Sequence, residues 1–78
     1  MSRYYFDLHN GDGPTCDNEG MELSSRDSVT RQITRILVDV ARDELPCEDR
    51  AVISVKVRDE AGKVVSVASL TFNNEWLD

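Results

Sequence analysis

The chain has 78 residues, enough for one small hydrophobic core and too few for two, so residues 1–78 are expected to form a single domain. Hydrophobic residues make up 40% of the chain and charged residues 31%, which excludes intrinsic disorder, and no apolar run approaches the roughly 20 residues that cross a bilayer. The net charge of −6 disfavours nucleic acid as a general partner, since phosphate binding needs clustered Lys and Arg.

Residues 3–9 alternate in polarity, which predicts a strand whose buried face carries Tyr4, Phe6 and Leu8. The glycine-rich and proline-containing segment 10–14 predicts a turn. Residues 15–23 then form a weaker strand, interrupted by a turn or bulge at residues 17–20, and we pair it with the first strand as an irregular hairpin.

Residues 25–45 form the only segment whose apolar residues recur at the helical period. The apolar stripe consists of Val29, Ile33, Ile36, Leu37, Val40 and Ala41. Ser24 and Ser25 are alternative N-cap residues, and Pro46 predicts that the helix stops near residues 44–47. The predicted helix therefore has one face to bury, and a small sheet is its natural partner.

Residues 51–58 show the cleanest alternation in the chain, with Ile53, Val55 and Val57 on one face. Residues 59–63 predict a hairpin loop, and residues 64–72 complete the hairpin. Apolar residues occupy both parities of this last strand, and we favour a bulge near residues 66–69 over burial on both faces. Trp76 and Leu77 follow, either folded back on the domain or held out for a partner.

Together these elements predict an α+β fold of β-β-α-β-β order, a four-stranded antiparallel sheet with one amphipathic helix packed on one face. The first residues are broken by Asp7 and His9 before a signal-peptide core could form, so we expect a cytoplasmic protein. In that compartment Cys16 and Cys47 are expected to be reduced thiols.

Residues 3–6, 17–23 and 59–62, together with Gly11, form a combination that resembles one family of small bacterial proteins classed as a domain of unknown function. The family begins with Arg-Tyr-Phe-Phe or a close variant, has an Asp-x-Glu-Gly-x-Glu-Leu element before its helix, and matches this chain at residues 3–6, Gly11, 17–23 and 59–62. The chain departs from the family in its less alanine-rich helix and in Asp7, where a histidine is common. The resemblance implies the same fold and a cytoplasmic setting, and it implies no mechanism.

A one-layer sheet with one helix leaves its second face open, and this face is the leading candidate for function. The residues proposed for this interaction surface are Tyr5, Asp7, His9, Lys56, Arg58 and Trp76. We therefore expect a protein-interaction or accessory module without catalytic activity or cofactor, acting on a protein partner of unknown identity or on a second copy of itself. Self-association through an edge strand is the other form that this interaction could take.

The alternative function is a nucleic-acid-associated regulator, in which Arg31, Arg35 and Arg42 form a basic patch on the helix. Asp39 stands near two of them in sequence, and together with the net charge it favours an ordinary solvated helix face. A small enzyme or a metal-binding protein comes third. A nucleophilic site would use Cys16 or Cys47 with His9, and a metal site would draw on Asp7, His9, Asp12, Cys16, Asp17 and Glu19. The chain lacks the spacing of a zinc, calcium or nucleophilic motif.

Overall fold

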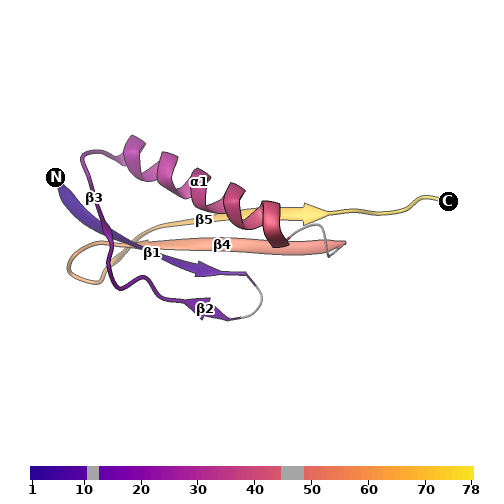
Figure 1. Ribbon diagram of the computed structural model, residues 1–78, viewed down its shortest axis with the longest axis horizontal. Helices are drawn as coiled ribbons and strands as arrows, with labels where there is room; N and C mark the ends of the chain where they lie inside the picture. Colours follow the sequence, from indigo (N-terminus) through magenta and orange to yellow (C-terminus); the bar gives the residue numbers. More distant parts are fainter. Residues whose placement is uncertain (11–12, 45–48) are drawn as a thin grey trace.

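One helix lies across one face of an antiparallel sheet in the computed structural model, which describes residues 1–10, 13–44 and 49–78 (Figure 1). The elements in chain order are β1 Ser2–His9, β2 Pro14–Thr15, β3 Met21–Leu23, α1 Arg26–Glu44, β4 Arg50–Arg58 and β5 Val64–Asn73. The α+β fold and its β-β-α-β-β order are confirmed, with the second predicted strand split into β2 and β3 around residues 16–20.

The sheet has the order β2-β1-β4-β5, and β3 also pairs with β1. Both short strands lie on the same outer edge of β1, antiparallel to it, with Leu8 opposite Thr15 and Tyr4 opposite Met21. Strand β4 therefore lies inside the sheet between β1 and β5. The remaining long edge belongs to β5, which pairs only with β4 among the described strands.

The core forms where α1 packs on the alternating face of β1 and β4. Ile53, Val55 and Val57 of β4 are 1%, 0% and 0% exposed, so the predicted alternation is confirmed. The other core residues are Phe6 of β1 and Val29, Ile33 and Leu37 of α1. Ala68 and Leu70 of β5 pack against this cluster from the side, which makes the helix-covered face the only apolar interior of the described chain.

Helix α1 begins after Ser25, which resolves the choice between two N-cap residues. The Ser25 hydroxyl accepts a hydrogen bond from the amide of Ser28 at 3.2 Å, and Asp27 and Arg42 place charges that suit the two ends of the helix dipole. No helix in the described ranges is both long and apolar enough to cross a membrane.

Some predictions concern residues that the structure does not describe. The helix is predicted to stop near residues 44–47, and α1 ends at Glu44, while Pro46 and Cys47 lie outside the described residues. Gly11 and Asp12 of the first predicted turn lie outside them as well.

The bulge in β5 occurs earlier than expected, and the prediction of residues 66–69 is wrong. Val57 of β4 faces Ser66, whereas Arg58 faces Val64, so Val65 is the additional residue. The extra residue is accommodated directly after the hairpin at residues 59–63, before regular pairing begins. From Ser66 onward the alternation is regular, with Ala68 and Leu70 on the helix side.

The N-cap assignment predicts unequal effects for two neighbouring serines. Ser25→Ala should lower the free energy of unfolding by about 1 kcal/mol, because the Ser28 amide loses its acceptor. Ser24→Ala, at an exposed position before the cap, should change it by less than about 0.5 kcal/mol. Urea unfolding followed by circular dichroism measures both, and equal losses would contradict the assignment.

Candidate functional site

The gap between β2 and β3 leaves one amide of β1 without a strand partner, and Asp17 fills this gap. Its Oδ2 accepts a hydrogen bond from the Phe6 amide at 3.1 Å, while Oδ1 accepts from the amides of Glu19 and Gly20 at 3.0 and 3.1 Å. Burial raises the pKa of the Asp17 carboxyl. The hydrogen bonds from the Phe6, Gly20 and Glu19 amides together lower this pKa by more than burial raises it, so the net shift is downward. Asp17 thus replaces one residue of a strand.

Asp7 and Arg58 form a two-point ion pair on the sheet face away from the helix. Arg58 Nε donates to Asp7 Oδ2 at 2.6 Å and Nη2 to Oδ1 at 3.0 Å, and Nη2 also donates to the Asp17 carbonyl at 3.0 Å. The Asp17 amide completes the ring by donating to Asp7 Oδ1 at 3.0 Å. The guanidinium carbon of Arg58 lies 5.1 Å from the centroid of the Tyr5 ring, within cation–π range.

This polar network is partly shielded from water, because the side chains of Asp7 and Arg58 are only 17% and 29% exposed. The hydrogen bonds from Arg58 lower the pKa of the Asp7 carboxyl, with smaller contributions from the Asp17 amide and the charges of Arg58 and Lys56, while burial opposes the shift. The same pair raises the pKa of Arg58. The network therefore holds two carboxylates in their charged form and ties β1, β4 and residues 17–20 together.

Gly20 allows residues 17–20 to lie against β1. Its φ of +71° lies in the left-handed region, and a Cβ there would stand 2.9 Å from both the Tyr4 carbonyl oxygen and Tyr5 Cε2. Any larger residue would push the turn away from the strand and stretch the bonds that Asp17 makes. The glycine is therefore required both by its backbone angle and by lack of space.

The close approach at Gly20 predicts that two left-handed glycines tolerate alanine differently. Gly62→Ala, where nothing lies within 4 Å of the added methyl, should cost about 1 kcal/mol of unfolding free energy from backbone strain alone. Gly20→Ala has similar strain and also meets Tyr4 and Tyr5, so its loss should exceed that of Gly62→Ala by at least about 1 kcal/mol. Chemical denaturation tests this order, and equal losses would contradict it.

The lowered pKa values of Asp7 and Asp17 predict loss of stability in acid. Their contribution is fully present above the unfolded value of 3.8 and is lost as pH falls from 3.8 through the lower folded values. Asp7→Asn should reduce stability near neutral pH by about 2 kcal/mol and flatten the stability curve below pH 4. Thermal unfolding between pH 7 and pH 2 measures this, with exposed Asp43→Asn as control, and an unchanged acid slope in Asp7→Asn would contradict it.

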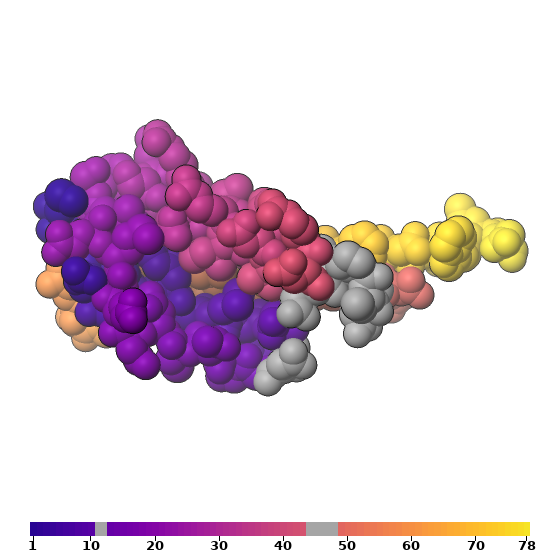
Figure 2. Space-filling view, in the orientation of Figure 1, coloured from indigo at the N-terminus to yellow at the C-terminus, as the bar shows by residue number. Residues whose placement is uncertain are grey.

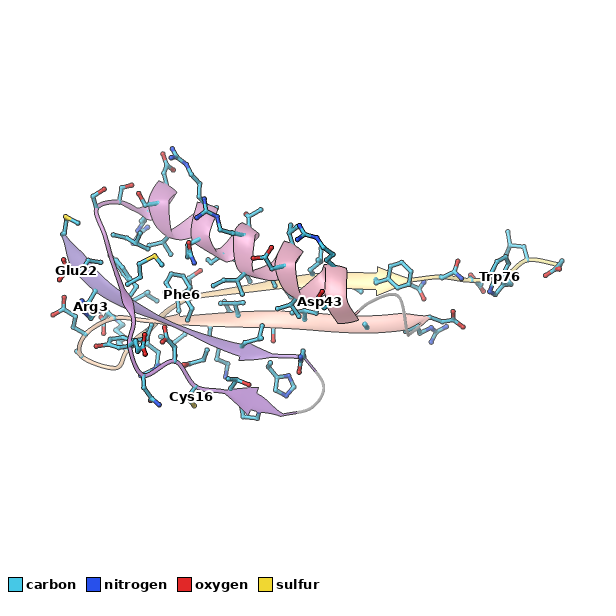
Figure 3. The ribbon with its side chains drawn as sticks, in the orientation of Figure 1. Arg3, Phe6, Cys16, Glu22, Asp43 and Trp76 are labelled. Carbon is cyan, nitrogen blue, oxygen red and sulfur yellow. The ribbon has the colours of Figure 1, made fainter. Side chains whose placement is uncertain are left out.

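The structure divides the proposed interaction surface into two parts. Tyr5, Asp7 and Arg58 come together in the network, where their polar groups are already paired. Lys56 is exposed beside them, opposite Asp7, and His9 is exposed at the end of β1, opposite Ser54. Trp76 lies far from this group, on the chain that continues beyond β5 (Figure 3).

The other candidate residues lie at the surface of the described chain. Arg31, Arg35 and Arg42 are exposed on α1, and Arg42 forms a 3.7 Å ion pair with Asp39. Cys16 is an exposed free thiol, whereas Cys47 lies outside the described residues. Among the residues described, no three His, Cys, Asp or Glu side chains are grouped closely enough to hold a metal ion.

The ladder between β4 and β5 shows which backbone groups of β5 remain available. The Asn74 amide donates to the Asp49 carbonyl at 2.7 Å, so this facing pair is hydrogen-bonded. Hydrogen-bonded pairs alternate along an antiparallel ladder, which makes Phe72, Leu70 and Ala68 the next residues bonded to β4. The amides and carbonyls of the residues between them point away from β4, along the free edge. These residues are Val67, Ser69, Thr71 and Asn73.

Apart from the bulge at Val65, the free edge of β5 lacks the features that usually protect such an edge. Residues 64–73 contain no charged residue and no proline, and Val65, Val67 and Phe72 are 48%, 64% and 37% exposed. The opposite edge differs, because β2 and β3 are short, β2 begins with Pro14, and Arg3 pairs with Glu22 at 3.6 Å beside β3. The sequence contained this signal, but only the strand order shows which strand is at the edge.

The two ends of β5 differ in shape. Beyond Asn73 the chain continues as a narrow arm that projects from the body, carrying Trp76 and Leu77 at 79% and 90% exposure (Figure 2). Near the start of β5 an open cavity of about 560 Å³ lies between β1, the first turns of α1 and the hairpin. Its wall includes Tyr4, Val29 and Val65.

Comparison with known proteins identifies the family of this chain. A model of a domain of unknown function, DUF6894, matches residues 3–71. The chain belongs to this family. No curated protein and no solved structure matches it. The DUF6894 match covers the network, the Gly20 turn and nearly all of β5, and it ends before Trp76.

Proposed function

We propose that this DUF6894 protein is a small protein-interaction module that accepts a partner's β-strand along the free edge of β5. One observation carries the proposal: β5 presents ten residues without a charge or a proline, and its outward amides and carbonyls have no strand beside them in the described chain. Main-chain hydrogen bonds to such an edge supply affinity for an extended partner, and the exposed side chains supply specificity.

The side chains on β5 define what kind of strand would fit. Toward the open face the edge presents Val67, Ser69 and Thr71, and toward the helix it presents Ala68, Leu70 and Phe72. Both faces are neutral and moderately apolar. A partner segment of alternating apolar and small polar residues therefore complements this edge better than a charged segment does.

The polar network supports a role without catalysis. The polar groups of Asp7, Asp17 and Arg58 are hydrogen-bonded within the network and to backbone groups. Such pairing is typical of side chains that stabilise a fold. The proposal places the module in the cytoplasm, where an exposed thiol such as that of Cys16 stays reduced. The proposal assigns no contact to the open-face residues His9 and Lys56, which lie on β1 and β4.

The edge proposal predicts different effects of one added charge on two facing strands. Ser69 lies on the edge strand β5 and faces Ser54 on the inner strand β4. Ser69→Lys should abolish capture of partner proteins by the tagged chain in native lysate, because a lysine on an edge opposes strand addition. Ser54→Lys adds the same charge to the same sheet face and should leave capture unchanged.

Circular dichroism and thermal unfolding must first show that both variants keep the fold. Quantitative mass spectrometry of the captured proteins then gives the readout. A partner set that survives Ser69→Lys as fully as Ser54→Lys would overturn the proposal, as would a partner set lost equally from both.

A further inference from the structure

The exposed arm and the open cavity lie at opposite ends of the same strand. The arm follows Asn73 at the end of β5, whereas Val65 and Ser66 at its start line the cavity. Figure 1 shows the arm leaving one end of the sheet, while the hairpin and the start of α1 lie at the other. An antiparallel neighbour on β5 would bring its own arm alongside this cavity.

The chain cannot fill its own cavity with this arm. Trp76 lies ten positions after Ser66 in the sequence, which corresponds to roughly 33 Å along an extended chain. Trp76 lies only three residues beyond Asn73, a reach of about 10 Å, so it cannot fold back over that distance. Only a different molecule can supply an indole from this position in the sequence.

We propose that the strand added to β5 is β5 of a second copy, and that Trp76 of each copy enters the cavity of the other. The inference rests on the proposed function, because it names the occupant of the same edge. Two copies related by a twofold axis use the same surface twice, which closes the assembly and leaves neither β5 edge free. The two sheets would then join into one continuous sheet.

One register satisfies the geometry of the edge. When Trp76 of the second copy lies opposite Ser66 of the first, Thr71 of one copy faces Thr71 of the other on the twofold axis. Residues directly opposite in an antiparallel pair project to the same face, and Ser66 lies on the cavity side with Ala68 and Leu70. An arm that continues the alternation of β5 places Trp76 on that side as well.

The same register matches the outward backbone groups. Thr71, Ser69 and Asn73 point their amides and carbonyls away from β4, and the register pairs Thr71 with Thr71 and Ser69 with Asn73. Phe72 of each copy faces Leu70 of the other on the helix side. The Thr–Thr pair and the two apolar pairs are cross-strand combinations that stabilise a sheet.

The cavity offers a suitable environment for an indole ring. Tyr4, Val29, Ala61 and Val65 contribute apolar surface, and Thr30 and Ser66 contribute hydroxyl groups. The charged residues Arg26, Asp59 and Glu60 also line the cavity. At about 560 Å³ the cavity lies within the range of small-ligand sites, and it is partly open to solvent. Trp76 and Leu77 are among the most exposed apolar residues of the chain, so their burial would favour association.

The chain contains one tryptophan, so its fluorescence reports directly on this contact. Analytical ultracentrifugation should show a dimer that dissociates on dilution, and the emission maximum should move to longer wavelength over the same concentrations. Trp76→Ala should raise the dimer dissociation constant by at least about tenfold without changing monomer stability, since this side chain is exposed in the single chain.

Two exposed threonines of α1 provide a matched pair for the cavity. Thr30 lines it and Thr34 does not, and each hydroxyl donates to the carbonyl four residues earlier at 3.1 Å. Thr30→Arg should block the cavity, weaken the dimer and leave the tryptophan emission at its solvent-exposed wavelength. Thr34→Arg should leave both measurements unchanged.

The position of the axis is tested independently at Thr71, which faces Val52 on the inner strand. Thr71→Lys places two like charges on the axis and should dissociate the dimer, whereas Val52→Lys should not. In chains with Cys16→Ser and Cys47→Ser, oxidation should cross-link Thr71→Cys into a covalent dimer and leave Val52→Cys monomeric.

The outcomes separate this inference from the proposed function. If the wild-type chain stays monomeric at every concentration and Ser69→Lys still abolishes capture of partner proteins, the second copy is overturned as the occupant. The strand-accepting edge is then kept. A dimer that is indifferent to Trp76→Ala and Thr30→Arg would overturn the cavity contact. Absence of both dimer and edge-dependent capture would overturn both proposals.

Discussion

The outer edge of β1 depends on the carboxylate of Asp17, because among the described residues it is this side chain and not a strand that pairs with the Phe6 amide. An unpaired amide at that position would weaken the edge of the sheet, and a short side chain that accepts three amide bonds removes the problem. The Asp7–Arg58 pair then holds the Asp17 backbone from the other side. The network joins the two halves of the chain, since Arg58 lies 51 residues after Asp7.

This arrangement also explains why the two edges of the sheet differ in length, regularity and charge. Residues 16–20 cover one end of the open face and hold β2 and β3 on β1, so that edge is short, irregular and flanked by charge. The helix covers the opposite face and stabilises the core through Val29, Ile33 and Leu37. Neither residues 16–20 nor helix α1 covers the outer side of β5, so this strand keeps a long, neutral edge.

The sequence pattern placed part of the proposed open face correctly, but it did not place Trp76, which lies on the arm beyond β5 (Figure 3). Period-two alternation correctly placed Tyr5, Asp7 and Arg58 on one side of the sheet, because facing strands share that alternation. It could not show that they bond to one another and to residues 17–20, since those contacts depend on strand register. The Asp and Gly spacing of residues 17–20 indicated a turn, but not its place against β1.

The sequence by itself determined the fold class, the buried stripe of α1 and the core face of β4, because local periodicity dictates which side chains can be buried together. Tertiary structure alone decided the strand order, the bulge at Val65 and the choice of Ser25 as the N-cap. It also decided that β5 stands at an edge with a cavity at one end and Trp76 at the other. These features depend on contacts between distant segments, which no local pattern encodes.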